Sequence, residues 1–203
     1  MKIALIGDSH TQVTFDLLIP ILEQAGHTIV GRVSKAGWSA KSYLDNPQHI
    51  ENAVAGDPDL VLVSLGGNNF SLSDQYGQTV QRFLQAIDYP KKRVLWIGPF
   101  IALRDDVEKR HKWTTEWLSK NLPSNIPFID TRPVSKVGHR SDNVHFTSTA
   151  YRNMVNTLKK QILSSISLSP ALYYAKRKMP LIVFLTSLGL LGYVAWRKYG
   201  NTR

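Results

Sequence analysis

Residues 1–10 read MKIALIGDSH, so that a short apolar run comes directly before a Gly-Asp-Ser-His tetrapeptide. Four apolar residues are too few for a signal peptide, and no small-residue cleavage site follows them. A short apolar run that ends in a glycine-containing turn is typical of a buried β-strand. We therefore expect the chain to begin with a core strand that carries Gly7, Asp8, Ser9 and His10 at its carboxyl end.

The same alternation of strand and helix patterns continues to about residue 168. The strands are expected at residues 3–6, 28–33, 60–65, 94–97 and 127–129. The helices are expected at about 12–25, 47–55, 74–88, 105–120 and 148–166. Asn46 should cap the second helix with Pro47 at its first position, and Pro20 should kink or split the first helix. This order predicts an α/β fold of βαβ units around a five-stranded parallel sheet.

Composition excludes several classes of protein. The chain has 203 residues, 43% of them hydrophobic, and no Cys, which excludes disordered, collagen-like and disulfide-rich proteins as well as thiol chemistry. The formal charge is +10, but residues 1–170 carry 19 basic and 15 acidic side chains. Residues 171–203 carry six basic side chains and no acidic one. Since the basic excess lies mainly in the tail, no nucleic-acid partner is expected.

The tail contains a long apolar segment. Residues 180–196 read PLIVFLTSLGLLGYVAW, and basic residues lie on both sides of this run. Eighteen residues from Met179 would form a helix of about 27 Å, close to the ~30 Å of a bilayer core. We expect a domain at 1–168, a basic linker at 169–178, a single transmembrane helix at 179–198 that contacts membrane lipid, and a polar tail at 199–203. The excess of Lys and Arg before the span favours a cytoplasmic location for the domain.

The loops after the expected strands carry residues suited to acyl transfer. Ligands of an open parallel sheet bind beyond the carboxyl ends of its strands. Ser9 follows the first strand and is a candidate nucleophile, while Gly37 and Asn68 follow the second and third strands and could donate hydrogen bonds to an oxyanion. Asp142 and His145 are three residues apart, close enough for the carboxylate to orient the imidazole.

These residues together resemble the SGNH hydrolase family, also called GDSL esterases and lipases. The resemblance runs in order through Gly7-Asp8-Ser9, Gly37, the GxND-like residues 66–69 and the DxxH residues 142–145. It implies a flavodoxin-like three-layer α/β/α sandwich and hydrolysis of acetyl or other ester groups. It also implies roles for five residues: Ser9 as nucleophile, His145 as base, Asp142 as its orienting acid, and Ser9, Gly37 and Asn68 as the oxyanion hole.

Other residues on the same loops are candidates for contact with substrate. Asn69 stands where the family usually has Asp, so we expect altered loop contacts there. The candidate substrate-binding residues are His10, Trp38, Asn69, Phe70 and Phe100. His139 competes with His145 for the role of base, but only one base is needed and an exposed loop position is the simpler interpretation. Six scattered His residues predict no metal site, and no cofactor is expected.

Three functions remain open at this point. The first is a membrane-anchored esterase or deacetylase that acts on an acetylated glycan, a lysolipid or a small ester. The second is a structural or scaffold protein of a membrane complex or a membrane-containing virus particle, in contact with membrane protein partners. The third is a basic membrane-surface adaptor whose tail binds anionic lipid or nucleic acid. The complete set of catalytic candidates favours the first function.

Overall fold

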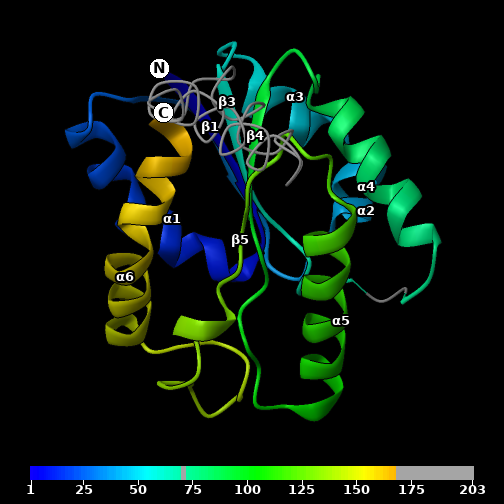
Figure 1. The fold of residues 1–203 in the computed structure, drawn as a ribbon, viewed down its shortest axis with the longest axis vertical. Coiled ribbons are helices and arrows are strands. Elements are labelled where there is room, and N and C mark those ends of the chain that lie inside the picture. Colours follow the sequence, from blue (N-terminus) through cyan, green and yellow to red (C-terminus); the bar gives the residue numbers. More distant parts are fainter. Residues whose placement is uncertain (70–71, 168–203) are drawn as a thin grey trace, which may run out of the picture. The chain divides into compact units, whose positions relative to one another are not determined.

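A central parallel sheet organises the protein (Figure 1). The computed structural model describes residues 1–69 and 72–167. The strands are β1 (Lys2–Gly7), β2 (Thr28–Ser34), β3 (Leu60–Ser64), β4 (Arg93–Ile97) and β5 (Phe128–Ile129). Their order in the sheet is β2-β1-β3-β4-β5, and every neighbouring pair is parallel. The α/β class, the five strands and the parallel sheet predicted from the sequence are confirmed.

Helices cover both faces of this sheet. They are α1 (Ser9–Gln24), α2 (Ala40–Asp45), α3 (Gln48–Val54), α4 (Gln75–Ala86), α5 (Asp105–Asn121), a 3-10 turn (Arg132–Val134) and α6 (Ser148–Ser167). Figure 1 shows α1 and α6 together on one side of the sheet and α2, α3, α4 and α5 on the other. The arrangement is a three-layer α/β/α sandwich, and residues 1–167 form one compact unit.

The alternation of side chains along each strand builds two cores. Ile3 and Leu5 of β1 point toward α1 and α6, whereas Ala4 and Ile6 point toward the other helical layer. Successive residues of a strand face opposite sides of a sheet, so a strand covered on both faces is apolar throughout. Residues 3–6 of β1 and residues 60–63 of β3 are all buried, which explains their continuous apolar runs.

The structure differs from the sequence-based predictions in three local features. Helix α2 was not predicted, because its six residues are too short to show helical periodicity; its capping box, formed by Ser39 and Ser42, fixes its start. Pro47 is itself the N-cap of α3, and the Asn46 amide donates to Ser42 O at the end of α2 instead of capping α3. Pro20 lies inside α1, which runs unsplit from Ser9 to Gln24.

The predicted membrane segment lies outside the described residues. The same is true of the linker at 169–178, the tail at 199–203 and the candidate substrate contact Phe70. Within residues 1–69 and 72–167, no helix has the length and apolar character that a membrane crossing requires.

Candidate active site

The turn between β1 and α1 holds Ser9 rigidly at the carboxyl edge of the sheet. Gly7 is required there, because a Cβ on it would lie 2.2 Å from the Thr11 hydroxyl oxygen. The Gly7 carbonyl accepts hydrogen bonds from the Tyr43 hydroxyl at 2.6 Å and from Lys35 N at 3.1 Å. Asp8 caps α1 by accepting from His10 N at 3.1 Å. These bonds fix the first residue of α1, which is Ser9.

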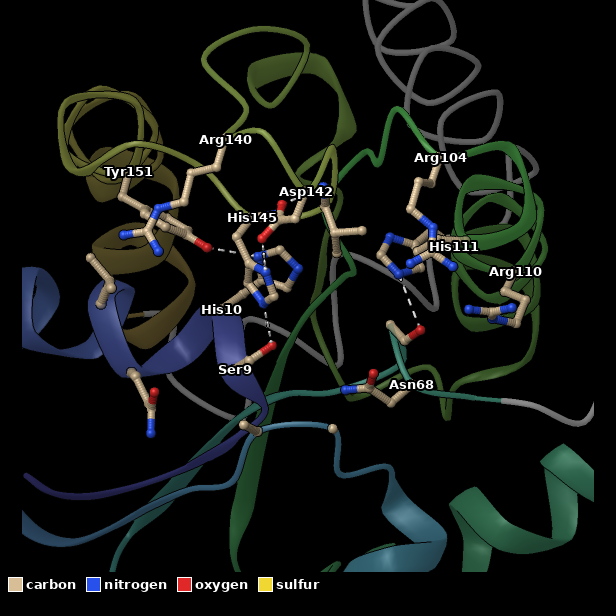
Figure 2. Close-up of a pocket in the computed structure, with 17 residues that line it drawn as sticks. Ser9, His10, Asn68, Arg104, Arg110, His111, Arg140, Asp142, His145 and Tyr151 are labelled. Carbon is tan, nitrogen blue, oxygen red and sulfur yellow. Dashed lines mark hydrogen bonds and ion pairs between the residues drawn. The ribbon is translucent and has the colours of Figure 1, made fainter.

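Ser9, His145 and Asp142 form one hydrogen-bonded chain. Figure 2 shows His145 between the other two side chains. His145 Nε2 lies 2.9 Å from Ser9 Oγ, and His145 Nδ1 lies 2.9 Å from Asp142 Oδ2. The order matches that of a nucleophile, a base and an orienting carboxylate. The structure thus brings together three residues that are up to 136 positions apart in the sequence.

Asp142 is held in its ionised form by the backbone of its own loop. Its Oδ1 accepts from Val144 N at 2.9 Å and from His145 N at 2.8 Å. Desolvation acts to raise the pKa of this carboxyl, but these two bonds and the bond from the His145 ring lower the pKa to about 2. A carboxylate at neutral pH can accept the Nδ1–H of the imidazole, which leaves Nε2 free to accept the Ser9 proton.

Gly37 and Asn68 lie on the same pocket as Ser9. Gly37 adopts a left-handed φ of +75°, a conformation that glycine takes without strain. The Asn68 side chain donates to Trp38 O at 3.2 Å and so connects the loop after β3 with the loop after β2. The cavity has a volume of about 630 Å³ and opens beside the Ser9 hydroxyl (Figure 2).

His111 lines the same pocket and was not predicted from the sequence. It is 2% exposed, with its ring nitrogens 2.6 Å from Phe100 O and 3.1 Å from Gly67 O. Burial lowers its pKa, while the two carbonyl acceptors act in the opposite direction. It joins α5 to the loop that carries Asn68. The signal for its burial was its spacing from Val107 and Leu118, four and seven residues away on the inner face of α5.

His10 lines the pocket from a buried position. It is 4% exposed, its Nδ1 lies 2.9 Å from the Tyr151 hydroxyl, and its ring centroid lies 5.0 Å from that of His145. Burial, and then the neighbouring His145 and His111, lower the pKa of His10 to about 3. The His10 ring is therefore neutral and packs against the His145 ring at the side of the pocket.

The other described candidates lie away from the cavity. Trp38 packs against Tyr43 and His49, Asn69 is buried beside a separate hollow near α4, and Phe100 belongs to an aromatic cluster with Phe146. Asn69 and Phe100 are buried, and Trp38 is partly buried against the core, so none of the three lines the cavity beside Ser9.

His139 does not compete with His145 for Ser9. Its Nε2 lies 3.0 Å from Ile101 O, and its ring stacks on Phe146 at 4.2 Å between centroids. Among the described residues, no group of three or more His, Asp or Glu side chains is placed to hold a metal ion.

Burial of Asp8 predicts an effect of pH on stability. Burial raises its pKa to about 7 against the hydrogen bond from His10 N, whereas an unfolded Asp titrates near 3.8. The stabilisation from the bound proton is fully present below pH 3.8 and is lost as the pH rises through about 7. Asp8→Asn keeps an oxygen for His10 N but cannot ionise. The free energy of unfolding of Asp8→Asn minus that of wild type at the same pH should therefore be larger at about pH 8 than at about pH 5.

Urea unfolding at these two pH values measures this difference. Glu23→Gln removes an exposed carboxylate at the end of α1 and serves as the control, with the same difference from wild type at both pH values. A constant difference for Asp8→Asn as well would contradict the raised pKa.

Solved structures with this fold include several ester hydrolases. The carbohydrate esterase family 3 protein from Talaromyces cellulolyticus matches with a TM-score of 0.60 at 18% identity, covering 83% of this chain and 100% of that one. A GDSL-like lipase from Bacteroides thetaiotaomicron matches with a TM-score of 0.58 at 16% identity, covering 81% and 88%. A catalytic mutant of an acetylxylan esterase from Geobacillus stearothermophilus matches with 0.57 at 16%, covering 83% and 95%. At these identities the likeness shows a shared fold.

Sequence comparison is less specific. No curated protein matches the chain. A family model described as "Protein of unknown function (DUF459)" matches residues 2–140. The matched range includes Ser9, Gly37 and Asn68 and ends just before Asp142.

Proposed function

The chain belongs to the DUF459 family of proteins of unknown function, and from this premise we propose that it is a serine ester hydrolase of the SGNH type. One observation carries the proposal: Ser9, His145 and Asp142 form a continuous hydrogen-bonded chain that opens into the cavity shared by Gly37 and Asn68. The fold shared with ester hydrolases from several organisms supports it.

Acylation begins at the Ser9 hydroxyl. Ser9 Oγ attacks the ester carbonyl carbon while its proton passes to His145 Nε2, 2.9 Å away. The imidazolium that forms is stabilised by Asp142, whose low pKa keeps it ionised. When the tetrahedral intermediate collapses, the bond to the alcohol oxygen breaks and His145 returns the proton to the leaving alcohol. The acyl group then remains on Ser9 Oγ as an ester.

The negative charge of the intermediate needs donors that are fixed before the reaction. Ser9 N–H, Gly37 N–H and the Asn68 amide are the three donors that we assign to this oxyanion hole. Asn68 is positioned by its bond to Trp38 O, and its loop is supported by His111. Water completes the cycle: it gives a proton to His145 Nε2 and attacks the acyl carbon. The bond from that carbon to Ser9 Oγ then breaks, His145 returns the proton to Ser9 Oγ, and the acid is released.

The substrate class that we propose is a small acyl ester, with acetyl esters first. The cavity of about 630 Å³ beside Ser9 is open to solvent. Two of the solved relatives by fold are a carbohydrate esterase and an acetylxylan esterase, which supports an acetylated glycan as one source of such an ester.

Covalent labelling with a fluorophosphonate probe tests the proposal. We expect the full-length protein in detergent to be labelled at Ser9, and Ser9→Ala to remain unlabelled while its circular dichroism is unchanged. Thr14→Ser serves as the matched control on α1, because it alters a hydroxyl residue away from the Ser9–His145 bond and should leave labelling intact. If the folded wild type takes no label, the esterase function is contradicted and the scaffold function is favoured.

We further propose that residues 179–198 anchor the protein in a membrane, with the domain on the cytoplasmic side. The support is the apolar run and the basic residues on both sides of it. Alkaline carbonate extraction of membranes measures this: an anchored chain stays in the pellet, and release into the supernatant would rule the anchor out.

A further inference from the structure

The cavity beside Ser9 gathers three arginines from two different parts of the chain. Arg104 is the N-cap of α5, Arg110 lies one and a half turns into that helix, and Arg140 lies on the loop before α6. Among the described residues that line the cavity, Asp142 is the one acidic side chain, and its charge faces His145. Hydrolysis of a neutral ester needs no such collection of positive charge.

Two of these arginines share a neighbouring carboxylate. Asp106 accepts from Arg104 Nε at 3.0 Å and from Arg104 Nη2 at 2.7 Å, and it lies 3.7 Å from Arg110 Nη1. Their positive charge is therefore partly offset by a residue outside the cavity wall. They contribute to the positive potential around the cavity, but they are already engaged.

Arg140 differs from them in its partners. Its guanidinium makes no ion pair with any residue that the structure describes, and its side chain is exposed at the cavity. Its backbone is fixed: Arg140 N donates to His145 O at 2.7 Å, and Asn143 N donates to Arg140 O at 3.0 Å. Figure 2 shows Arg140 on the side of Tyr151, across Asp142 and His145 from Arg104 and Arg110.

We propose that the ester substrate carries an anionic group, a carboxylate or a phosphate, that forms an ion pair with Arg140. This inference rests on the proposed esterase function and names its substrate class. The planar guanidinium presents paired N–H donors that match the oxygens of either anion. The hydrogen bond from Arg140 N to His145 O holds the backbone of Arg140 beside that of His145, so that the guanidinium extends from a point close to the scissile ester. Arg104 and Arg110 increase the rate of encounter with such a substrate.

Two matched pairs of esters test this proposal and show which side of the ester carries the anion. Mono-p-nitrophenyl glutarate has a carboxylate on the acyl side, and p-nitrophenyl butyrate is its neutral partner. 2-Acetoxyethyl phosphate has a phosphate on the alcohol side, and ethylene glycol monoacetate is its neutral partner. We expect wild type to prefer the anionic member of at least one pair by about 10-fold or more in kcat/KM.

Arg140→Gln should remove that preference. The expected loss is about 10- to 100-fold in kcat/KM for the preferred anionic ester, mostly through KM, with less than about 3-fold change for the neutral one. Arg82→Gln replaces an exposed arginine of α4, serves as the control and should change neither. Arg104→Gln should have a smaller effect than Arg140→Gln, because Asp106 already pairs with Arg104.

The outcomes separate this proposal from the esterase itself. Hydrolysis of the neutral esters with no preference for either anionic partner overturns the anionic substrate alone. A larger loss in Arg104→Gln than in Arg140→Gln, or an equal loss of neutral and anionic hydrolysis in Arg140→Gln, overturns the assignment to Arg140. Failure of both hydrolysis and fluorophosphonate labelling overturns the esterase.

Discussion

Replacement of His145 by alanine is expected to lower kcat for ester hydrolysis by about 10⁴- to 10⁶-fold. His145 Nε2 lies 2.9 Å from Ser9 Oγ, and without it the hydroxyl has no group to accept its proton. The fold should persist, because the His145 side chain is one-third exposed and its other partner is Asp142 on the same loop. Steady-state hydrolysis of p-nitrophenyl acetate and urea unfolding measure the two effects separately.

His139→Ala is the matched control for this prediction. It removes a second histidine from the same loop, but one that contacts Ile101 O and the Phe146 ring instead of Ser9. We expect it to lower the free energy of unfolding while the activity per folded molecule stays within about 10-fold of wild type. If His139→Ala abolished hydrolysis and His145→Ala did not, the two histidines would have to exchange roles.

Replacement of Trp96 by alanine is expected to cost about 3–5 kcal/mol of the free energy of unfolding. Trp96 lies in β4, is fully buried, and packs edge-on against Phe83 of α4. Its indole N–H donates to Leu65 O at 3.0 Å, directly before the loop that carries Asn68. The alanine variant would therefore leave both a cavity and a buried carbonyl without its donor. Since domains are stable by about 5–15 kcal/mol, this single change approaches global unfolding.

Trp96→Phe separates the two contributions. It keeps most of the apolar volume and loses the hydrogen bond, so the expected cost is about 1–2 kcal/mol. Trp113→Ala, a half-buried tryptophan on α5, is the control for loss of an indole and should cost less than Trp96→Ala. Chemical denaturation with urea gives all three values. Equal costs at positions 96 and 113 would contradict the central place of Trp96 in the core.

The two strands β1 and β3 could be predicted because they are buried on both faces. Residues 3–6 and 60–63 are apolar without interruption, and the structure confirms strands there within two residues at each end. Periodicity over more than ten residues similarly identified α4, α5 and α6. Helix α2 has only six residues, so its capping serines were the one local signal, and such serines are equally common in turns.

In the candidate site, contacts between residues close in sequence could be predicted, whereas contacts that depend on residues distant in sequence mostly could not. The Asp142–His145 contact could be predicted because the two residues are three apart in one loop. Their meeting with Ser9 follows from the parallel sheet, whose strand ends share one edge. The packing of Trp38 against the core and the burial of Phe100 could not be predicted, because an aromatic residue on a loop packs into the core or lines a cavity according to neighbours distant in sequence. The catalytic roles of all these residues stay predictions until hydrolysis is measured.

The distance of 136 positions between Ser9 and His145 has a consequence for synthesis in the cell. At about 5–20 residues per second, the ribosome makes His145 on the order of 10 s after Ser9. During that interval the nascent chain carries the serine but no base, and the hydrogen-bonded chain closes only when the loop that carries Asp142 and His145 has folded against Ser9. Reactivity of Ser9 toward a fluorophosphonate would therefore mark the completion of folding of the whole domain.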